Sequence, residues 1–533
     1  MNKGSSSHYF LLTIAIGLVI GVFVSLVTEN IQLKRQARVV AASKFDEVMY
    51  RIANAYVDTI DIDELEEAAI VALMEQLDPH SQYISVEEFN AVNDPLLGSF
   101  EGIGVQFRVV EDTVTIVNTI KGGPSERVGI MAGDRIVYVD DSLIAGIHIK
   151  NESVMRLLKG PKGTRVQVRV SRRGEPDLVE FTIIRDVIPT YSVDIAYMLD
   201  DATGYIKISK FSATTHNEFL KAARDLKNAG MTRLVLDLRG NGGGYLGEAV
   251  DIADEFLPRG SLVVFTEGRF RPKTTYQARK RGLLEDLPLA VLIDDESASA
   301  SEIVAGAIQD NDRGIIVGRR SFGKGLVQEQ VMLSDNSAIR ITVARYYTPT
   351  GRCIQKPFTG TLEDYLKESY DRYMNGELFS ADSVHLNDTL KYYTPKGKVV
   401  YGGGGIMPDV YVPLVDDSTE YYFNRIANLG ILYQYAFDYC DQHRQALSRY
   451  ATVDDFIRSF RVTDAMFNEL VARAERKGLV GDAAERQVAR REANVLLKAY
   501  IARDLFGEEG FYPIYREMDD VLARALEALD GLE

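Results

Sequence analysis

Three serines, Ser297, Ser299 and Ser301, alternate with alanines just before a helix-like segment in DDESASASEIVAGAIQD (294–310). A serine hydroxyl becomes a nucleophile when a nearby base removes its proton. The same residues could instead be ordinary polar residues at the start of a helix. The choice between these interpretations depends on whether the chain also supplies a base.

A lysine is the better candidate for this base. The six histidines lie in sequence contexts without a catalytic motif, and no GxSxG segment of the Ser-His-Asp hydrolases is present. Lys324 lies between Gly323 and Gly325, and burial of a lysine lowers its pKa from about 10.4. Gln328 follows four residues later and could orient the amine without adding charge. A surface lysine in a turn is the alternative interpretation.

The segment around Lys324, GRRSFGKG (318–325), also matches most of a phosphate-binding GxxxxGK loop. That loop needs a serine or threonine next, to hold magnesium, and then a helix whose N-terminus meets the phosphates. Here Gly325 takes that position and strand-like residues follow. The sequence therefore argues against a nucleotide site.

A second glycine-rich segment, LDLRGNGGGYLGEAV (236–250), stands between a predicted strand and a predicted helix. Gly242, Gly244 and Gly247 satisfy GxGxxG, which is typical of dinucleotide-binding folds. These glycines lie further from the strand than that fold requires. The run could instead point backbone N–H groups into a cleft as half of an oxyanion hole, or form a plain tight turn.

The chain has 533 residues, so we expect several domains. Its formal net charge of -16 repels phosphate backbones, which makes nucleic acid an unexpected partner. The two cysteines, Cys353 and Cys440, form neither a CxxC pair nor a metal-binding spacing. Without a His/Cys/Asp ligand cluster, we expect neither a metal nor a cofactor.

The N-terminus contains 19 uncharged residues, Tyr9–Val27, close to the ~20 that cross a bilayer. No convincing small-x-small cleavage site follows, which favours an uncleaved membrane anchor over a signal peptide or a buried helix. Lys3 precedes the segment, whereas Lys34, Arg35 and Arg38 follow it. The flanking charges therefore do not favour an outside location for the rest of the chain.

The pattern of strand-like and helix-like segments in the remaining chain predicts an α/β multidomain protein. Short β-type runs separated by Gly-Pro and Gly-Asp turns indicate a small β domain, and strand–helix alternation after it indicates parallel α/β layers. An apolar stripe near the end marks a packing or assembly helix. The predicted segments are a membrane anchor (1–28), a helical region (29–97), a β domain (98–187), an α/β core (188–413) and a helical C-terminal domain (414–533).

The β domain opens on GSFEGIGVQF and continues as GGPSERVGIMAGDRIVYVD, and this whole segment resembles a PDZ domain. Successive N–H groups of a Gly-x-Gly loop can bind the terminal carboxylate of a peptide, which then adds a strand to the sheet edge. The residues expected to form this carboxylate loop are Gly102, Ile103, Gly104 and Val105.

After the PDZ-like segment come five further motifs: DLRGNGGG, SASASEIVAGAIQD, GRRSFGKGLVQ, YYTPTGRCIQ and GGGGIMPDV. Together they resemble the carboxyl-terminal processing, or tail-specific, serine peptidases over about residues 40–413. The resemblance implies a ClpP/crotonase-like core with a Ser/Lys dyad assisted by glutamine. Matched motif by motif, these residues are Ser299, Lys324 and Gln328, and Lys324 follows Ser299 by 25 positions. The backbone N–H groups of Ala300 and Gly243 would then form the oxyanion hole.

The resemblance implies a serine endopeptidase that captures the free C-terminal tail of a protein and cleaves near it. It also implies an extracytoplasmic location, so the predicted anchor would lie in the inner membrane and leave the catalytic domain in the periplasm. Arg319 and Arg320 stand where the family often has an acidic residue, and Lys159 is a candidate for coupling the PDZ domain to the active site. The helical C-terminal domain falls outside the common core, where a homo-oligomer or adaptor contact is expected. The rival interpretation is a non-catalytic, membrane-tethered PDZ scaffold; dinucleotide binding ranks third.

Overall fold

The computed structural model describes residues 44–358, 361–414 and 421–531. Two compact units divide the chain, one ending at Leu77 and the other starting at Asp78. The predicted membrane anchor, residues 1–28, lies outside the described residues. Within the three described ranges, no helix is both long and apolar enough to span a bilayer.

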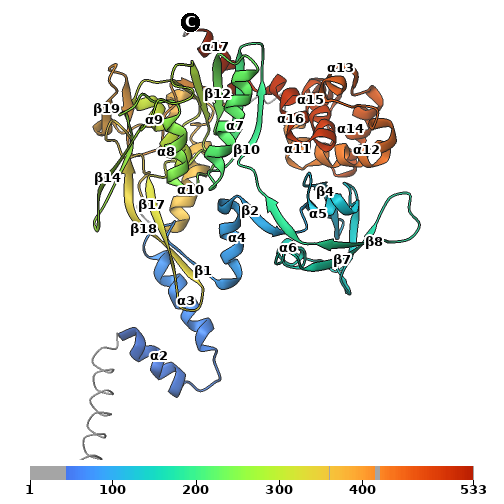
Figure 1. Cartoon of the computed structure of the whole chain (residues 1–533), viewed down its shortest axis with the longest axis horizontal. Coiled ribbons are helices and arrows are strands. Elements are labelled where there is room, and N and C mark those ends of the chain that lie inside the picture. The colour runs from blue at the N-terminus through green and yellow to red at the C-terminus, as the bar shows by residue number, and fades with distance from the viewer. Residues whose placement is uncertain (1–43, 359–360, 415–420, 532–533) are drawn as a thin grey trace, which may run out of the picture. The chain divides into compact units, whose positions relative to one another are not determined.

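The described part of the first unit is helical, as the sequence predicts for this region (Figure 1). It contains α2 (Lys44–Ala55) and α3 (Ile62–Glu75). Asp61 caps α3 by accepting the N–H groups of its first turn. The rest of the predicted helical region belongs to the second unit, where β1 (Gln82–Ile84) joins a sheet before α4 (Val86–Leu97).

The small β domain is built on an antiparallel sheet with strand order β3-β4-β5-β7-β8, in which β6 also pairs with β5. Alternate side chains of β7 point into the domain core, and these are the buried Val166, Val168 and Val170. Among the strands that the structure describes, β3 pairs with β4 alone, so its other edge has no strand partner. The elements are β2 (Ser99–Gly102), β3 (Val105–Val110), β4 (Thr113–Thr119), α5 (Pro124–Val128), β5 (Arg135–Val139), β6 (Ser142–Leu143), α6 (Asn151–Leu158), β7 (Arg165–Ser171), β8 (Val179–Ile184) and β9 (Asp186–Pro189).

The α/β core contains a six-stranded sheet of order β10-β11-β12-β15-β16-β21, parallel except for the antiparallel β10–β11 pair. Parallel strands require crossover helices, and the sequence supplies them between the strands. The strands are β10 (Val193–Met198), β11 (Thr203–Ile208), β12 (Arg233–Asp237), β15 (Leu289–Ile293), β16 (Ile315–Gly318) and β21 (Val410–Tyr411). The crossover helices are α7 (Thr215–Asn228), α8 (Leu246–Asp254) and α9 (Ala300–Asp310).

Alternate residues of this sheet face different layers. On β12, Leu234 and Leu236 belong to the apolar cluster that includes residues of α7, α8 and α9. Val235 between them belongs to a second cluster with Leu522 and Leu529, which lie on α17 (Asp520–Asp530). Because both faces are covered, the strands read as continuous apolar runs in the sequence.

A second, antiparallel sheet carries the residues that follow the lysine loop. Its order is β1-β18-β13-β14, and β17 pairs with β18. The strands are β13 (Leu262–Gly268), β14 (Arg271–Gln277), β17 (Leu326–Met332) and β18 (Ala338–Tyr347). After them come α10 (Leu362–Met374) with the short 3-10 helices η1 (Ala381–Ser383) and η2 (Asp388–Leu390), and the β19 (Lys391–Tyr393)–β20 (Val399–Tyr401) hairpin.

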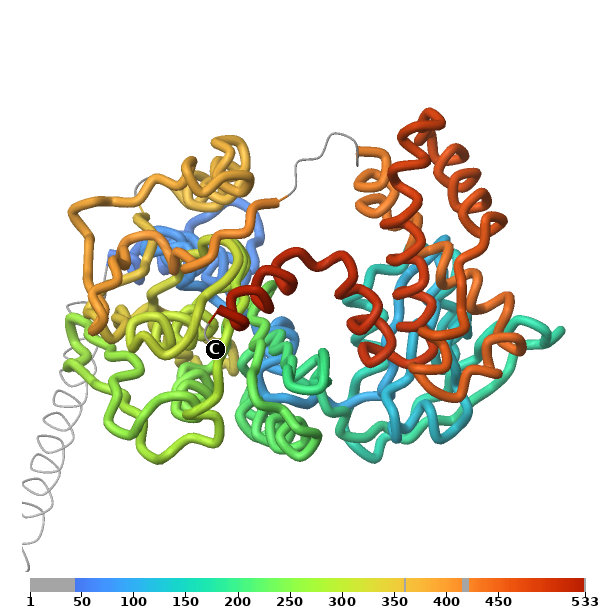
Figure 2. The backbone as a smooth tube through the Cα atoms, turned by 90° about the horizontal axis from the view of Figure 1, so that it is seen from above, coloured from blue at the N-terminus to red at the C-terminus, as the bar shows by residue number. Residues whose placement is uncertain are grey.

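The C-terminal segment is helical, as predicted, but its last helix packs on the α/β core. Helices α11 to α16 enclose a separate apolar cluster, whereas the predicted apolar stripe on α17 is buried against β12, β15 and β16. Figure 2 shows this end of the chain, in dark red, returning to the sheet. The other helices are α11 (Tyr421–Asn428), α12 (Ile431–Leu447), α13 (Val453–Ser459), α14 (Asp464–Arg476), α15 (Ala483–Phe506), α16 (Glu508–Tyr515) and η4 (Arg516–Met518). The predicted boundary at residue 413 thus separates segments that share one core.

Candidate active site

Ser299 lies at the turn that joins β15 to α9. Its backbone has φ 55° and ψ -110°, a conformation that a residue with a Cβ rarely adopts. Such strain is of order 1–3 kcal/mol and persists only where the surroundings enforce it, often at functional sites. Ala300 is the first residue of α9, so its N–H has no carbonyl partner within the helix.

The two outer serines fix this turn against the neighbouring loop. Ser297 Oγ donates to the carbonyl oxygen of Leu238 at 2.9 Å, and Ser301 Oγ donates to that of Asn241 at 2.8 Å. Both side chains are fully buried. Their interpretation as simple polar residues at a helix start is therefore incomplete, because they attach the serine turn to the loop after β12.

The glycine run after β12 approaches the serine turn closely. A Cβ added to Gly243, which has φ 105°, would lie 2.7 Å from the Ser299 Cβ and 3.0 Å from the Ala300 nitrogen. A Cβ on Gly244 would lie 2.0 Å from the carbonyl oxygen of Phe211. Only glycine fits at these two positions, and it allows the loop to lie directly against the serine turn.

Gly243, predicted as the second oxyanion donor, has its N–H engaged in this structure. It donates to Oδ1 of Asn241 at 2.9 Å, while Nδ2 of Asn241 donates to the carbonyl oxygen of Ile208 at 2.9 Å. The Asn241 side chain thereby holds the glycine run in place. The role of Gly243 stays a prediction.

Lys324 occupies the loop between β16 and β17, and its amine meets Gln328. Nζ of Lys324 donates to Oε1 of Gln328 at 3.1 Å. Nε2 of Gln328 donates to the backbone carbonyl oxygen of His80. A carbonyl oxygen can only accept, so His80 fixes the orientation of the amide and presents its oxygen to the lysine.

Burial lowers the pKa of Lys324 from its ordinary value of 10.5, and the positive charge of Arg340 lowers it further. The carboxylates of Asp78 and Glu302 act in the opposite direction. A neutral amine can accept a proton, so this environment suits a base.

Glu302 joins the serine turn to the lysine loop. Its Oε2 accepts the N–H of Ser299 at 2.9 Å and the N–H of Lys324 at 2.8 Å. Its Oε1 accepts the N–H of Gly323 at 2.7 Å and the hydroxyl of Ser321. Burial raises the pKa of this carboxyl, and the four donated hydrogen bonds oppose that shift. One side chain therefore holds both halves of the predicted dyad.

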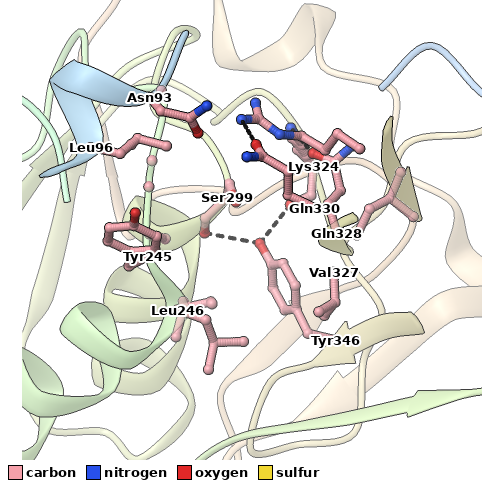
Figure 3. Close-up of a pocket in the computed structure, with 17 residues that line it drawn as sticks. Asn93, Leu96, Tyr245, Leu246, Ser299, Lys324, Val327, Gln328, Gln330 and Tyr346 are labelled. Atoms are coloured by element: carbon pink, nitrogen blue, oxygen red, sulfur yellow. Dashed lines mark hydrogen bonds between the residues drawn. The ribbon is translucent and has the colours of Figure 1, made fainter. Parts of the chain in front are cut away.

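Tyr346 makes a second connection between these two segments. Its hydroxyl lies 3.0 Å from the carbonyl oxygen of Ser299 and 2.7 Å from that of Lys324 (Figure 3). Burial raises the pKa of Tyr346 well above its ordinary value, so the phenol stays protonated and can donate.

Of the histidines that the structure describes, His80 contacts a predicted site residue, and it does so through its backbone carbonyl. Its imidazole Nε2 lies 2.9 Å from the hydroxyl of Tyr365. Burial and the charge of Lys324 lower the pKa of His80 to about 4, so the ring is neutral. The sequence contexts of the histidines gave no sign of this contact, because it is made by the backbone of His80 and not by its imidazole.

A cavity of about 460 Å³ contains the predicted residues (Figure 3). It is lined by residues of five segments: α4, the glycine run with the start of α8, the serine turn with the start of α9, the lysine loop, and the β17–β18 hairpin. The lining residues are Asn93, Leu96, Gly242, Gly243, Gly244, Tyr245, Leu246, Ser299, Ala300, Ile303, Lys324, Leu326, Val327, Gln328, Gln330, Arg340 and Tyr346. The structure thus brings Ser299, Lys324, Gln328, Gly243 and Ala300 to one cavity.

The glycine loop is supported from behind by the end of the chain. Arg239 forms two hydrogen bonds with Asp519, at 2.8 and 2.7 Å, and also contacts Asp237 at 2.6 Å. Burial pushes the pKa of Asp237 up, but the charges of Arg239 and Lys207 bring it well below its ordinary value. Asp519 directly precedes α17, so the C-terminal helix and the glycine loop are coupled through one arginine.

The two basic residues that depart from the family pattern have acidic partners elsewhere. Arg319 pairs with Asp295 at 2.9 Å. Arg320 forms a bidentate pair with Glu377, at 2.6 and 2.7 Å, just after α10. These pairs hold the loop that leads to Lys324, which gives the departure a structural role.

The predicted carboxylate loop lies at the start of β3. Gly102, Ile103 and Gly104 are buried, and Ser125 of α5 donates its hydroxyl to the carbonyl oxygen of Ile103 at 2.6 Å. Lys159, at the end of α6, forms an ion pair with Asp94 of α4 at 2.8 Å. Because α4 also lines the catalytic cavity, Lys159 connects the β domain to the site.

Several site residues are absent from the sequence-based prediction. Glu302 follows Ser299 by three residues, which is the spacing of a helix capping box and a usable signal. Arg239, Tyr346 and Arg340 lie in ordinary strand or loop sequences, so only the fold reveals them. Among the described residues, no cluster of His, Cys, Asp and Glu is placed to hold a metal ion.

Comparison with known proteins assigns each part of this arrangement to a class. Residues 202–366 match Peptidase family S41, and residues 102–183 match the PDZ domain. Residues 422–507 match a family of unknown function (DUF8443). The protein is therefore a serine-type peptidase that carries a PDZ domain.

Its relatives give the family more narrowly. A carboxy-terminal-processing protease of Bartonella bacilliformis is 35% identical over 317 residues, which are 59% of this chain and 72% of that protein. Carboxy-terminal processing protease CtpA of Bacillus subtilis is 34% identical over 337 residues, 62% of this chain and 71% of that protein. A solved photosystem II D1 C-terminal processing protease is 30% identical, covering 58% of this chain and 84% of that one with a TM-score of 0.34. The chain belongs to the carboxy-terminal processing protease family, and the predicted family and enzyme class are confirmed.

Proposed function

We propose that the protein cleaves polypeptides near their free C-termini with Ser299 as nucleophile and Lys324 as base. The observation that carries the proposal is the shared cavity, which a strained serine and a desolvated lysine both line, while a buried carboxylate binds the backbone N–H groups of both.

In this mechanism, Lys324 takes the proton of the Ser299 hydroxyl as the oxygen attacks the peptide carbonyl. Gln328 accepts a hydrogen bond from the amine and keeps it directed into the cavity. The N–H of Ala300 and an N–H of the glycine run stabilise the oxyanion. The ammonium of Lys324 then protonates the leaving amine, and water hydrolyses the ester on Ser299.

The PDZ domain would supply tail recognition. Gly102, Ile103, Gly104 and Val105 bind the terminal carboxylate, and the open edge of β3 accepts the tail as an added strand. Tails that end in small or apolar residues are the expected ligands. The ion pair between Lys159 and Asp94 would couple tail binding in the PDZ domain to the position of α4, which lines the cavity.

The cellular setting is also a proposal. The uncharged segment Tyr9–Val27 would anchor the protein in the inner membrane, with the peptidase on the periplasmic side. The helical C-terminal segment would offer the surface for a second copy or an adaptor. Protease protection of the full chain in intact and permeabilised spheroplasts tests the location; digestion from the cytoplasmic side would contradict it.

The function is tested with two forms of one peptide substrate, which differ only in a free or an amidated C-terminus. The purified full chain should cleave the free form faster by about tenfold or more, because amidation removes the charge that the loop binds. Equal rates would contradict tail recognition. Tight binding of the free form without any product would instead support the scaffold interpretation.

A further inference from the structure

The catalytic cavity is strongly asymmetric in charge. None of the 17 described residues that line it is acidic, whereas Lys324 and Arg340 are basic. The whole chain carries a formal net charge of -16, so this absence is not a consequence of composition. With Lys324 neutral in its role as base, Arg340 supplies the fixed charge of the cavity.

Arg340 lies near the start of β18 between two glutamines. In the sheet its backbone pairs with Gln82 of β1 on one side and with Gln330 of β17 on the other. Its guanidinium donates to Oε1 of Gln330 at 3.1 Å. Across residues 44–358, 361–414 and 421–531, Arg340 forms no ion pair with an acidic side chain. The guanidinium has five N–H groups, so most of its donors face the cavity or solvent.

Uncompensated charge of this kind is unusual for a partly buried arginine. Removing a cation from water costs free energy unless a partner restores the lost interactions. Burial accordingly lowers the pKa of Arg340 from its ordinary value. The other arginines near the site are neutralised by acidic partners. Arg320 forms an ion pair with Glu377, and Arg239 forms ion pairs with Asp237 and Asp519.

We propose that Arg340 binds a carboxylate of the substrate next to the scissile bond, which makes it a specificity-determining residue of the catalytic cavity. A carboxylate accepts two parallel hydrogen bonds from a guanidinium, and Gln330 and Asn93 line the same cavity. The carboxylate belongs either to an Asp or Glu side chain or to the chain end itself. This inference rests on the proposed cleavage at Ser299.

Binding at Arg340 would also act on the base. The charge of Arg340 lowers the pKa of Lys324, whereas Asp78 and Glu302 raise it. A bound carboxylate neutralises the arginine, so the lysine becomes a stronger base when such a substrate is present. Replacing Arg340 by a neutral residue should likewise move the pH at which activity rises to a higher value.

The test compares Arg340→Gln with wild type on alanine-rich peptides that share a free C-terminus. One glutamate is moved along the peptide, and each peptide has a partner with glutamine at that place. In wild type, kcat/KM should be about ten- to a hundredfold higher for the glutamate peptide than for its glutamine partner at one position. In Arg340→Gln this ratio should fall to about one. The matched control is Arg345→Gln, an exposed arginine of the same strand outside the cavity, which should keep the wild-type ratio.

The two sources of the carboxylate are separated by amidating the C-terminus of a peptide without glutamate. If the chain end binds Arg340, the ratio of free to amidated rates falls in Arg340→Gln. If the chain end binds only the PDZ domain, that ratio stays at its wild-type value and the glutamate ratio alone responds.

The inference is overturned if wild type shows neither a glutamate preference nor an amidation effect that Arg340→Gln removes. It is also overturned if Arg340→Gln and Arg345→Gln show the same glutamate-to-glutamine ratio of kcat/KM. Both outcomes still include peptide cleavage. Failure of the proposed function looks different, because wild type would then leave every peptide intact.

Discussion

One oxygen of Glu302 accepts the backbone N–H of Lys324 at 2.8 Å, and the same oxygen accepts the N–H of Ser299. Ser299, the proposed nucleophile, and Lys324, the proposed base, come from different loops and are 25 residues apart in the chain. Their relative position therefore depends on a side chain that performs no chemistry itself. This arrangement gives the buried carboxylate at the centre of the site a positioning role.

The Glu302→Gln variant should lose about a hundredfold or more in kcat. All four partners of the Glu302 carboxylate are hydrogen-bond donors. In glutamine an NH₂ group replaces one of the two oxygens, so at least one of these donors loses its acceptor and faces another donor. Glutamine should therefore rescue little relative to alanine. Steady-state kinetics and thermal unfolding measure both effects; the control is Glu296→Gln, on the exposed side of the same turn. Near-wild-type kcat in Glu302→Gln would contradict a positioning role.

Two substitutions of Gln328 should separate orientation from charge. Gln328→Ala removes the acceptor for the Lys324 amine and should lower kcat about ten- to a hundredfold. Gln328→Glu adds a negative charge there, which raises the pKa of Lys324.

A rate that requires the neutral amine increases as pH rises through the pKa of Lys324. Burial places this increase below the ordinary 10.5, and Gln328→Glu should move it to higher pH. Profiles of kcat against pH provide the measurement. An unchanged profile in Gln328→Glu would show that the amine does not titrate in the reaction.

The contact between Asp519 and Arg239 should matter for both stability and activity. Asp519→Ala removes two charged hydrogen bonds and the acceptor for the N–H of Leu522, which should cost about 1.5–3 kcal/mol. Asp519→Asn keeps the cap and loses the charge, so its unfolding free energy should be intermediate. The exposed Glu517→Ala is the control.

The activity of the Asp519 variants distinguishes a coupling role from simple stabilisation. At a temperature where each variant is fully folded, kcat should still be reduced, because Arg239 and the glycine loop lose support. KM should change less. Equal kcat in Asp519→Asn and wild type would mean that the end of the chain stabilises the core without affecting the catalytic loop.

The Lys159–Asp94 ion pair should couple tail binding to cleavage. Lys159→Glu and Asp94→Lys should each lower kcat/KM on free-tailed peptides about two- to fivefold, a modest effect because both side chains are partly exposed. The double exchange restores an ion pair and should recover part of the loss. Amidated peptides provide the control, since all variants should then be similarly slow. Strict additivity of the two single effects would exclude coupling through this pair.

The sequence was sufficient to predict the site residues that lie in a recognisable motif. The fold explains why the other site residues could not be predicted. Ser299 and Lys324 lie in short patterns whose residue types already limit the chemistry. Arg239 and Asp519 are 280 residues apart, and their contact depends on α17 crossing to the sheet face that Val235 lines. The apolar stripe of α17 predicts a packing helix but does not identify the surface that it covers.

Local strain and orientation also lay beyond sequence reasoning. The φ of 55° at Ser299 arises because Ser297 and Ser301 bind the neighbouring loop, which only the assembled turn reveals. Gly243 was predicted as an oxyanion donor from its place in a glycine run. The structure shows its N–H bound to Asn241, a contact set by backbone geometry rather than by residue type.

The most direct test of the account compares Ser299→Ala with Lys324→Ala in the purified full chain, on an unfolded protein with a free C-terminus. Both variants should bind the substrate as tightly as wild type and lose at least about a thousandfold in cleavage rate. The double variant should be no slower than either single variant, because the two residues act as one unit. Cleavage by Ser299→Ala at a rate near that of wild type would contradict the assignment of the nucleophile and with it the proposed mechanism.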